Sequence, residues 1–406
     1  MSQSRTPMLL IGLLSAFSLL TFDLYQPSLP FITHYFDTTH NLSQLTLSIY
    51  LFVFGVSQLI WGPLIDHFGR RRLLPASLWL AVVASFICIF APNITVLILG
   101  RALQGFALCC SNLIALSSSR DFEDTDERAK VLSYVSMIIA VSPILAPIIG
   151  SLIFTYFNWQ ANFVVMAGIA MTLIIQSHKG LKESPFWLQP KKTFKLSKVI
   201  KDYKQILTLP ILWCGSMIMM FSFAAVMLSI INSSYLIIDQ LGFSPLGFSI
   251  IFIFNGLNII VGNYLGIWLR KYVTIATSIY IGNALIILGG AAMLLTSTLY
   301  GFSLTSLSFA LISNLGISIS APGTMALTLT DFKENSGLAL AFINTIRMFG
   351  SSLLSMLIGY LLMQNLNALP LGLIATGIGA LYFSWHFNRL TAEPDDSELD
   401  SAHATT

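Results

Sequence analysis

The chain has 406 residues, of which 55% are hydrophobic and only 10% are charged, and its formal net charge is +3. Its mean hydropathy of +0.78 is more than a soluble domain needs or tolerates. The composition therefore indicates a polytopic membrane protein embedded in a lipid bilayer. The small net charge gives no support for a nucleic-acid partner.

Twelve apolar runs of about 20 residues follow one another along the chain, as expected of an all-α membrane protein. They are predicted to begin near residues 8, 44, 73, 94, 131, 159, 209, 245, 274, 300, 337 and 366. The first run has no small-residue cleavage site after it, so we interpret it as an uncleaved helix and not as a signal peptide.

Lys and Arg residues are confined to one side of the predicted spans. Apart from Arg101 and Arg347, which lie inside spans, every Lys and Arg falls at a terminus or in a loop on the same side. The loops near residues 36, 92, 158, 240, 297 and 365, on the other side, contain neither residue type. Short loops rich in positive charge stay in the cytoplasm. We therefore predict a multi-pass protein of the cell inner membrane with both termini cytoplasmic.

A long, lysine-rich loop at 178–207 divides the chain into two predicted six-helix halves, 1–177 and 208–390. Its amphipathic part, 194–207, could lie along the inner membrane surface or form a solvated linker. The acidic tail, 391–406, is predicted to be disordered. Two six-helix halves around a central loop are typical of secondary transporters, whose substrate site lies between the halves near the middle of the membrane.

Two ionisable residues are predicted to lie at the same depth in the membrane. Asp23 in the first span and Arg101 in the fourth each stand near the periplasmic end of their helix. About seven residues at a rise of 1.5 Å put both roughly 10 Å from that face, so we expect the side chains to meet. Such a pair could couple proton and substrate binding, or it could be a static pair that orders the bundle.

Arg347 lies near the middle of the eleventh span, one turn from Asn344. The second half has no acidic residue at comparable depth. Arg347 could bind an anionic group of a substrate or reach Asp23 across the cavity. Alternatively, it could donate hydrogen bonds to free carbonyls at Pro322 or to a polar side chain such as Asn314.

The fifth span contains Pro143 and Pro147 at positions i and i+4, followed by Gly150. Each proline removes a backbone hydrogen bond and favours a bend, while a glycine permits close packing. The bend could be a simple kink, or it could let the cavity open to each side in turn.

The loop after the second span, GPLIDHFGRRRLL, combines glycine with dense charge. Its arginines alone indicate a cytoplasmic loop, and its glycines should allow close helix approach and a tight turn. The ordered set is more specific and resembles the loop motif of the major facilitator superfamily between helices two and three: Gly62, Asp66, Gly69, Arg70 and Arg71.

Further motifs resemble the Bcr/CflA group of drug:proton antiporters in that superfamily. Residues 101–105 are similar to the fourth-helix motif R-x-x-Q-G, and residues 142–151 to the proline-glycine motif of the fifth helix. The first-helix pattern D-x-Y-x-P-x-x-P and the R-D after helix four are matched by Asp23, Tyr25, Pro27, Pro30, Arg120 and Asp121.

The resemblance implies a proton-coupled antiporter in which Asp23 is the protonatable carboxylate and Arg101 its modulator. Asp66 and Arg70 would hold a gate closed on the cytoplasmic side, against the start of the eleventh helix and the acidic loop 121–127. The other implied gating residues are Gly62, Gly69, Arg120 and Asp121; those shaping helix five are Pro143, Pro147 and Gly150. The substrate cavity is expected to include Tyr25, Gln104, Asn344 and Arg347.

Departures from the family pattern bear on the substrate. Arg347 stands where glutamine is expected, Gln160 where arginine is common, and Ser142 and Ser151 where alanine and glycine are usual. Asp23 is then the lone deep acid against two arginines. This balance disfavours lipophilic cations and favours neutral, zwitterionic or carboxylate-bearing substrates.

We therefore expect a monomeric, proton-coupled efflux transporter for small drug-like amphiphiles. The alternatives are an exporter of a carboxylated metabolite such as a siderophore and, less favoured, a proton-coupled uptake symporter. The loops carry no nucleophile or phosphate-binding motif, so an enzyme is not expected. The four cysteines lie in apolar runs without CxxC spacing or nearby histidines, so we expect no metal site and no cofactor.

Overall fold

The computed structural model describes residues 6–118, 121, 125–183, 196–330, 332 and 336–392, and within these ranges it is helical, with no β-strand. Eleven described helical segments are long and apolar enough to cross a membrane, and the apolar part of a further helix, Val141–Tyr156, supplies the twelfth. The predicted all-α fold with twelve spans is confirmed. Arg120, residues 184–195 of the central loop and residues 393–406 of the tail lie outside the described residues.

The first half contains six spans. The first is built from three short elements, α1 (Met8–Asp23), the 3-10 turn η1 (Gln26–Ser28) and α2 (Leu29–Tyr35). The others are α3 (His40–Phe68), α4 (Arg70–Ile89), α5 (Ile94–Ser118), α6 (Thr125–Tyr156) and α7 (Trp159–Gly180). Several helices begin a few residues earlier than predicted. Their first turns are polar and lie at the water interface, so an apolar run in the sequence does not include them.

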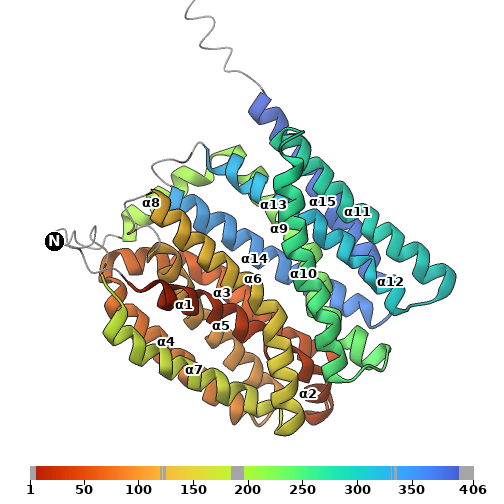
Figure 1. The fold of residues 1–406 in the computed structure, drawn as a ribbon, viewed down its shortest axis with the longest axis horizontal. Coiled ribbons are helices and arrows are strands. Elements are labelled where there is room, and N and C mark those ends of the chain that lie inside the picture. The colour runs from red at the N-terminus through yellow and green to blue at the C-terminus, as the bar shows by residue number, and fades with distance from the viewer. Residues whose placement is uncertain are drawn as a thin grey trace, which may run out of the picture.

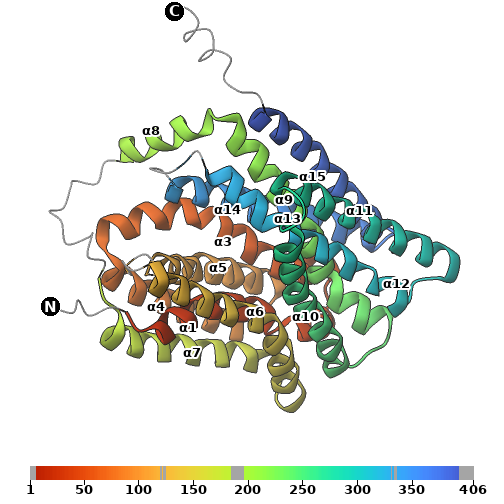
Figure 2. The same ribbon diagram turned by 45° about the horizontal axis from the view of Figure 1, so that its top comes forward.

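The second half repeats this count after α8 (Leu196–Leu207), a helix within the predicted central loop. Its spans are α9 (Pro210–Ser234) continued by the π-helical turn η4 (Tyr235–Gln240), α10 (Pro245–Leu269), α11 (Ile275–Tyr300), α12 (Leu304–Ser308) with α13 (Ala310–Leu329), α14 (Ser336–Leu362) and α15 (Ala368–Ala392). Figures 1 and 2 show the two halves side by side.

Two helix pairs join the halves. Helix α14 packs against both α3 of the first half and α9 of its own, and α6 packs against α10. Figures 1 and 2 both show α6 and α10 passing beside each other. The Oγ of Ser249 on α10 donates a hydrogen bond to the carbonyl oxygen of Pro147 on α6, at 2.8 Å.

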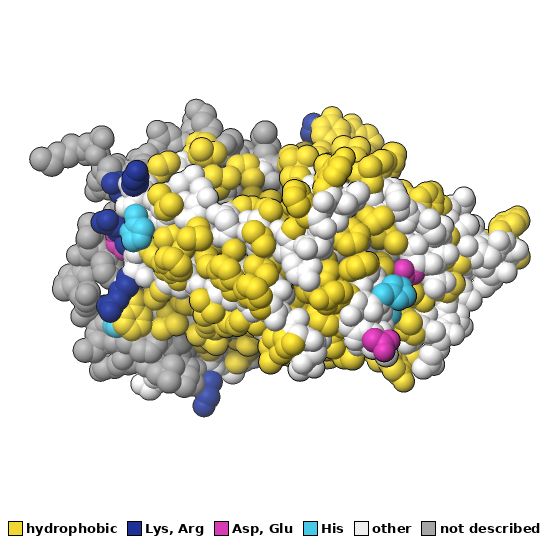
Figure 3. All heavy atoms as spheres, turned by 90° about the horizontal axis from the view of Figure 1, so that it is seen from below, with side chains coloured by type: hydrophobic (Ala, Val, Ile, Leu, Met, Phe, Trp, Pro, Cys, Tyr) yellow, Lys and Arg dark blue, Asp and Glu magenta, His cyan; other side chains and the backbone are white. Residues whose placement is uncertain are grey.

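The surface is that of a membrane protein. On the face drawn in Figure 3, hydrophobic side chains form a broad band, and Lys and Arg lie mainly toward one end. We call the end that carries Arg70, Arg71 and Arg72 the basic end and the opposite one the far end. By the distribution of positive charge, the basic end is predicted to be cytoplasmic.

The first span is interrupted near its middle. Helix α1 stops at Asp23, Tyr25 adopts φ −102° and ψ 0°, and helical structure resumes through η1. Pro27 and Pro30 lack backbone N–H groups, so the regular hydrogen-bond ladder cannot pass through this segment. The break places free backbone carbonyls and the Asp23 side chain together inside the membrane.

The two glycines of the α3–α4 loop behave differently. Gly69 has φ +81°, a conformation that residues with a Cβ rarely adopt, so the predicted tight turn is confirmed. The prediction that Gly62 permits a close helix approach is wrong for this structure. A Cβ at Gly62 would meet no described atom within 4 Å.

Helix α6 continues through Pro143 and Pro147, and Gly150 after them lies directly against the first span. A Cβ on Gly150 would collide with the carbonyl oxygen of Leu24, which belongs to the break. The predicted close packing at Gly150 is confirmed, and it fixes α6 against the interrupted part of the first span.

The variant Gly150→Ala is therefore expected to lower the free energy of unfolding by roughly 1–3 kcal/mol, the usual cost of overpacking. Thermal unfolding of the purified protein in detergent measures the change. Gly168→Ala is the matched control, because Gly168 on α7 has no described neighbour within 4 Å of the added Cβ. Equal unfolding temperatures for the two variants would contradict the assignment.

Candidate functional site

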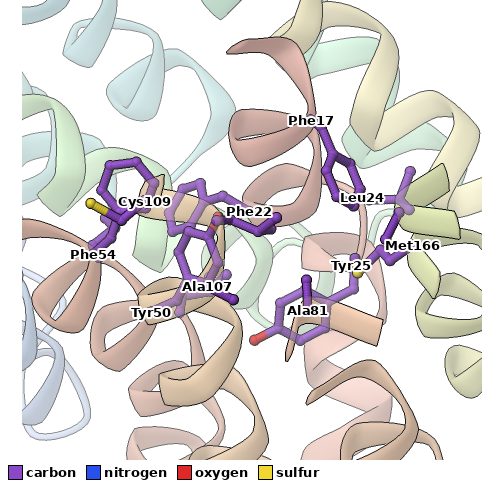
Figure 4. Close-up of a cluster of buried hydrophobic side chains, with 14 of the residues drawn as sticks. Phe17, Phe22, Leu24, Tyr25, Tyr50, Phe54, Ala81, Ala107, Cys109 and Met166 are labelled. Carbon is purple, nitrogen blue, oxygen red and sulfur yellow. The ribbon is translucent and has the colours of Figure 1, made fainter. Parts of the chain in front are cut away.

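Arg101 on α5 is fully buried in the first half, with 0% of its surface exposed. Its guanidinium carbon lies 4.6 Å from the ring centre of Tyr25 and 4.5 Å from that of Tyr50. Figure 4 shows Tyr25, from the break in the first span, and Tyr50, from α3, in the buried cluster of this half. The two aromatic faces stabilise the cation by cation–π attraction where water is absent.

The hydrogen bonds of Arg101 go to uncharged oxygens. Its Nη1 donates to Oε1 of Gln104 at 2.6 Å and to the carbonyl oxygen of Thr21 at 3.3 Å, and its Nε donates to the carbonyl oxygen of Thr46 at 3.4 Å. Thr21 lies in the last turn of α1, where a cation complements the negative end of the helix dipole. Arg101 thus ties the end of α1 to α3 and α5.

Asp23 does not pair with Arg101. Its Oδ1 accepts a hydrogen bond from Nε2 of Gln26 at 2.6 Å, and the structure records no ion pair between these two described residues. The predicted pair is therefore wrong. The break brings Gln26 to the carboxyl of Asp23, and the Arg101 guanidinium donates instead to Gln104 and to backbone carbonyl oxygens. Asp23 itself remains buried, with 4% of its surface exposed.

Tyr25 and Gln104 are enclosed within the first half. The hydroxyls of Tyr25 and Thr46 share a hydrogen bond, and Nε2 of Gln104 donates to Oγ of Ser85 on α4 at 2.8 Å. Neither Tyr25 nor Gln104 is exposed here. Their contact with a substrate stays a prediction, and in this conformation they order the helices around Arg101.

Arg347 and Asn344 on α14 are both partly exposed. The guanidinium carbon of Arg347 lies 4.8 Å from the ring centre of Phe223 on α9, and its Nε is buried without a partner. Asn314 donates to Asn255 at 3.0 Å, and its Oδ1 is buried without a partner, so it accepts no hydrogen bond from Arg347. In the described part of the chain the structure shows no hydrogen bond or ion pair to this guanidinium.

At the basic end, Arg70 forms an ion pair with Asp121, with Nη1 and Oδ2 2.5 Å apart. Its Nη2 also donates to the carbonyl oxygen of Ser117 at 3.0 Å. Both members of the pair are buried. Two predicted gating residues, Arg70 at the start of α4 and Asp121 after the end of α5, are thus in contact. Arg120 lies outside the described residues.

Two contacts at the basic end were not predicted. Glu183 accepts hydrogen bonds from the backbone N–H groups of Arg70 and Arg71, at 2.8 and 3.2 Å. An acid at the first residues of α4 complements the helix dipole. The contact could not be predicted from the sequence, because Glu183 is far from α4 along the chain. Asp66, an exposed residue, lies close enough to α8 to act on Tyr203: burial first, and then the charge of Asp66, raise the pKa of Tyr203 to about 12.

The halves touch along α3 from its beginning to its middle. At the far end, Nε2 of Gln44 donates to Oδ1 of Asn232 at 2.7 Å, and His40 stacks on Tyr235 with ring centres 4.1 Å apart. Near the middle, Oγ1 of Thr345 donates to the carbonyl oxygen of Gly55 at 2.9 Å.

The close packing of α14 on α3 differs between two glycines of α3. A Cβ on Gly55 would lie 2.8 Å from Cβ of Met348 on α14, whereas one on Gly62 would meet no described atom within 4 Å. Residues seven apart share nearly the same face of a helix. The close approach of α14 at Gly55 is therefore not repeated at Gly62, two turns closer to the basic end.

Comparison with known proteins extends these observations. A family model described as Major Facilitator Superfamily matches residues 11–355. The uncharacterized MFS-type transporter YdgK of Bacillus subtilis (strain 168) is 28% identical over 385 residues, covering 92% of this chain and 93% of that protein. The multidrug resistance protein MdtL of Escherichia coli (strain SMS-3-5 / SECEC) is 33% identical over 162 residues, covering 40% of this chain and 41% of that protein.

A solved structure supports the fold. The crystal structure of a D-xylose-proton symporter matches with a TM-score of 0.72 at 15% identity, covering 94% of this chain and 97% of that one. At this identity the likeness concerns the arrangement of helices alone.

The variant Arg101→Lys is expected to lower the free energy of unfolding by roughly 1–3 kcal/mol, because an ammonium group cannot lie flat between two rings and reach three acceptors. Thermal unfolding in detergent measures the loss. Arg71→Lys is the control, since the side chain of Arg71 is exposed. An unchanged unfolding temperature for Arg101→Lys would show that its hydrogen bonds do not stabilise the first half.

Proposed function

The chain belongs to the Major Facilitator Superfamily, and from that premise we propose that it is a proton-coupled exporter of small amphiphilic, drug-like molecules. The observation that carries the proposal is the Asp23 carboxyl, buried at the break in the first span. In the described part of the chain it has no cationic partner and accepts a hydrogen bond from Gln26. Acidic side chains inside membrane spans mark proton and ion pathways. Asp23 is therefore assigned to carry the proton.

Gln26 can hold Asp23 in both protonation states. When the carboxyl is ionised, Nε2 of Gln26 donates to it at 2.6 Å. When the carboxyl has gained a proton it becomes a donor, and Oε1 of Gln26, which is buried without a partner, can accept once the amide turns over. Proton uptake then reverses the direction of this hydrogen bond, with the carboxyl as donor and Oε1 of Gln26 as acceptor.

The position of Gln26 connects the proton to the rest of the molecule. Gln26 is the first residue of η1, and η1 packs against α9 and α10 of the second half. A change at Asp23 therefore occurs at a joint between the halves. This supports the coupling of proton binding to their relative movement, which is the basis of alternating access.

The open space beside Gly62 supports a conformation open toward the basic end. The halves are in contact at the far end through Gln44 and Asn232, and in the middle through Gly55 and Thr345. Transport requires a second state in which the basic ends approach and the far ends part. In that state Gly62 would face α14, and the lack of a side chain would allow the two helices to approach closely.

Relatives and motifs support export as the direction. Multidrug resistance proteins are among the curated relatives, and the motifs around Asp23, Arg101 and Pro147 resemble drug:proton antiporters of the Bcr/CflA group. The proposal places the protein in the inner membrane with both termini cytoplasmic, as a monomer that exchanges protons for substrate.

Asp23→Asn is expected to abolish proton-driven transport, because an amide cannot exchange a proton. Everted inner-membrane vesicles that express the protein are energised with NADH, and uptake of the dyes rhodamine 123 and rhodamine 110 is followed before and after nigericin collapses the pH gradient. The wild type should lose uptake on nigericin addition, and Asp23→Asn should lack it from the start. Asp37→Asn, which makes the same chemical change at an exposed turn, should transport normally. Nigericin-sensitive uptake by Asp23→Asn would refute the mechanism, and the same activity found solely in right-side-out vesicles would reverse its direction.

Gly62→Leu is expected to stop transport while leaving the unfolding temperature unchanged. The Cβ that it adds meets no described atom within 4 Å in the present conformation, and the leucine side chain would block the approach of α3 and α14 in the other one. Gly168→Leu is the control, since Gly168 also has no described neighbour within 4 Å but lies on α7, away from the joint between the halves. Normal transport by Gly62→Leu would show that α3 and α14 do not close at this level.

A further inference from the structure

We propose that the transported molecule carries a carboxylate and that Arg347, together with Asn344 one turn before it, binds that group. The inference rests on the proposed function, because it names the substrate class of the same transporter. It starts from a guanidinium placed within the membrane for which the structure shows no acceptor in the described part of the chain.

Arg347 lies deep in the membrane. It is ten residues from the start of the Gly337–Leu362 span, which at 1.5 Å per residue is about 15 Å, or near the middle of the hydrocarbon core. A cation at this depth is costly and is found where it faces a cavity or a partner. The ring of Phe223 at 4.8 Å stabilises one face of the guanidinium but accepts none of its hydrogen bonds.

Three other described arginines have acceptors. Arg101 donates to Gln104 and to backbone carbonyls, and Arg70 pairs with Asp121. Arg270 donates to the carbonyl oxygen of Ile319 at 3.2 Å. Arg101 also has one unpaired donor, its buried Nη2. Arg347 differs in being partly exposed and in having no acceptor for any of its donors in the described part of the chain, which is the arrangement that a ligand would complete.

The orientation of α14 turns Arg347 and Asn344 away from lipid. The lipid-facing side of this helix is marked by three residues with more than half of their surface exposed: Leu353, Leu357 and Tyr360. At 100° per residue, Asn344 points about 170° and Arg347 about 110° from the mean direction of these three. Both side chains are nevertheless partly exposed. They therefore border space inside the bundle.

Asn344 adds a second donor to the same site. It precedes Arg347 by three residues, so the two side chains are neighbours on the helix surface. Its amide, like the guanidinium, has no hydrogen-bond partner recorded among the described residues. A guanidinium presents paired N–H groups to the two oxygens of a carboxylate, and the amide can donate to the same group.

The distribution of charge favours the same ligand. Asp23 is enclosed and bound to Gln26, so it offers little attraction to a cation. Arg347 is partly exposed and unpaired, so the accessible charge is positive. Such a site should reject lipophilic cations and bind molecules with an anionic group.

The test compares two dyes that differ by one ester. Rhodamine 110 has a free carboxylate, and rhodamine 123 is its methyl ester. Binding to the purified protein in detergent is measured by fluorescence anisotropy. We expect wild-type protein to bind rhodamine 110 at least about tenfold more tightly than the ester, as for a charge-assisted hydrogen bond.

Variants assign that preference to Arg347. Arg347→Gln should reduce the ratio of the two affinities to about one, and Arg347→Lys should retain part of it. Arg71→Gln removes a charge at the exposed basic end and should leave the ratio unchanged. A preference for the ester, equal affinities in the wild type, no binding of either dye, or a preference that survives in Arg347→Gln would each overturn the inference.

A measurement on wild-type protein stands even if Arg347→Gln does not fold. Benzoate should displace bound rhodamine 110 at lower concentration than methyl benzoate, and the reverse order would overturn the inference. The inference and the proposed function fail differently. Nigericin-sensitive transport of rhodamine 123, combined with no preference for the carboxylate in binding, would overturn the proposed binding site alone. Transport that is unchanged by nigericin and by the Asp23→Asn substitution would overturn proton coupling.

Discussion

The interruption of the first span at Asp23 is the constraint on which the first half depends. Inside a membrane every backbone polar group needs a partner, so a broken helix must have its free carbonyls satisfied by other elements. Arg101 supplies this partner by donating to the carbonyl oxygen of Thr21 in the last turn of α1, and it also donates to the carbonyl oxygen of Thr46 on α3. Its guanidinium is itself held between Tyr25 and Tyr50. The guanidinium thus stabilises a helix break that an isolated span could not maintain.

Because Arg101 is engaged with backbone carbonyls and Gln104, Asp23 is left without a cation and pairs with Gln26. This separation matters for mechanism, since a carboxyl bound by an uncharged amide can exchange a proton without dismantling an ion pair. Gln26 also opens η1, the segment that packs on α9 and α10. Proton exchange and contact between the halves therefore share one short stretch of chain.

The contacts between α3 and the second half differ along the length of the helix. Polar contacts at Gln44 and Gly55 hold α3 to the second half, whereas a Cβ on Gly62 would meet no described atom within 4 Å. The ion pair between Arg70 and Asp121 lies within the first half, so it can persist as the halves move. Arg347 stands on α14, which lines this joint, with its donors directed away from lipid.

The sequence by itself determined the number of spans, the tight turn at Gly69 and the family, because hydropathy, glycine and charged motifs act over short stretches of chain. It also identified Asp23, Arg101 and Arg347 as the ionisable residues inside spans. The tertiary structure alone decided their partners: Gln26 for Asp23, backbone carbonyls for Arg101, and Glu183 for the start of α4. Depth along a helix can be counted from sequence, but rotation about its axis and the path of a broken span depend on packing against other helices. For that reason equal depth brought Asp23 and Arg101 into one cluster without making them a pair.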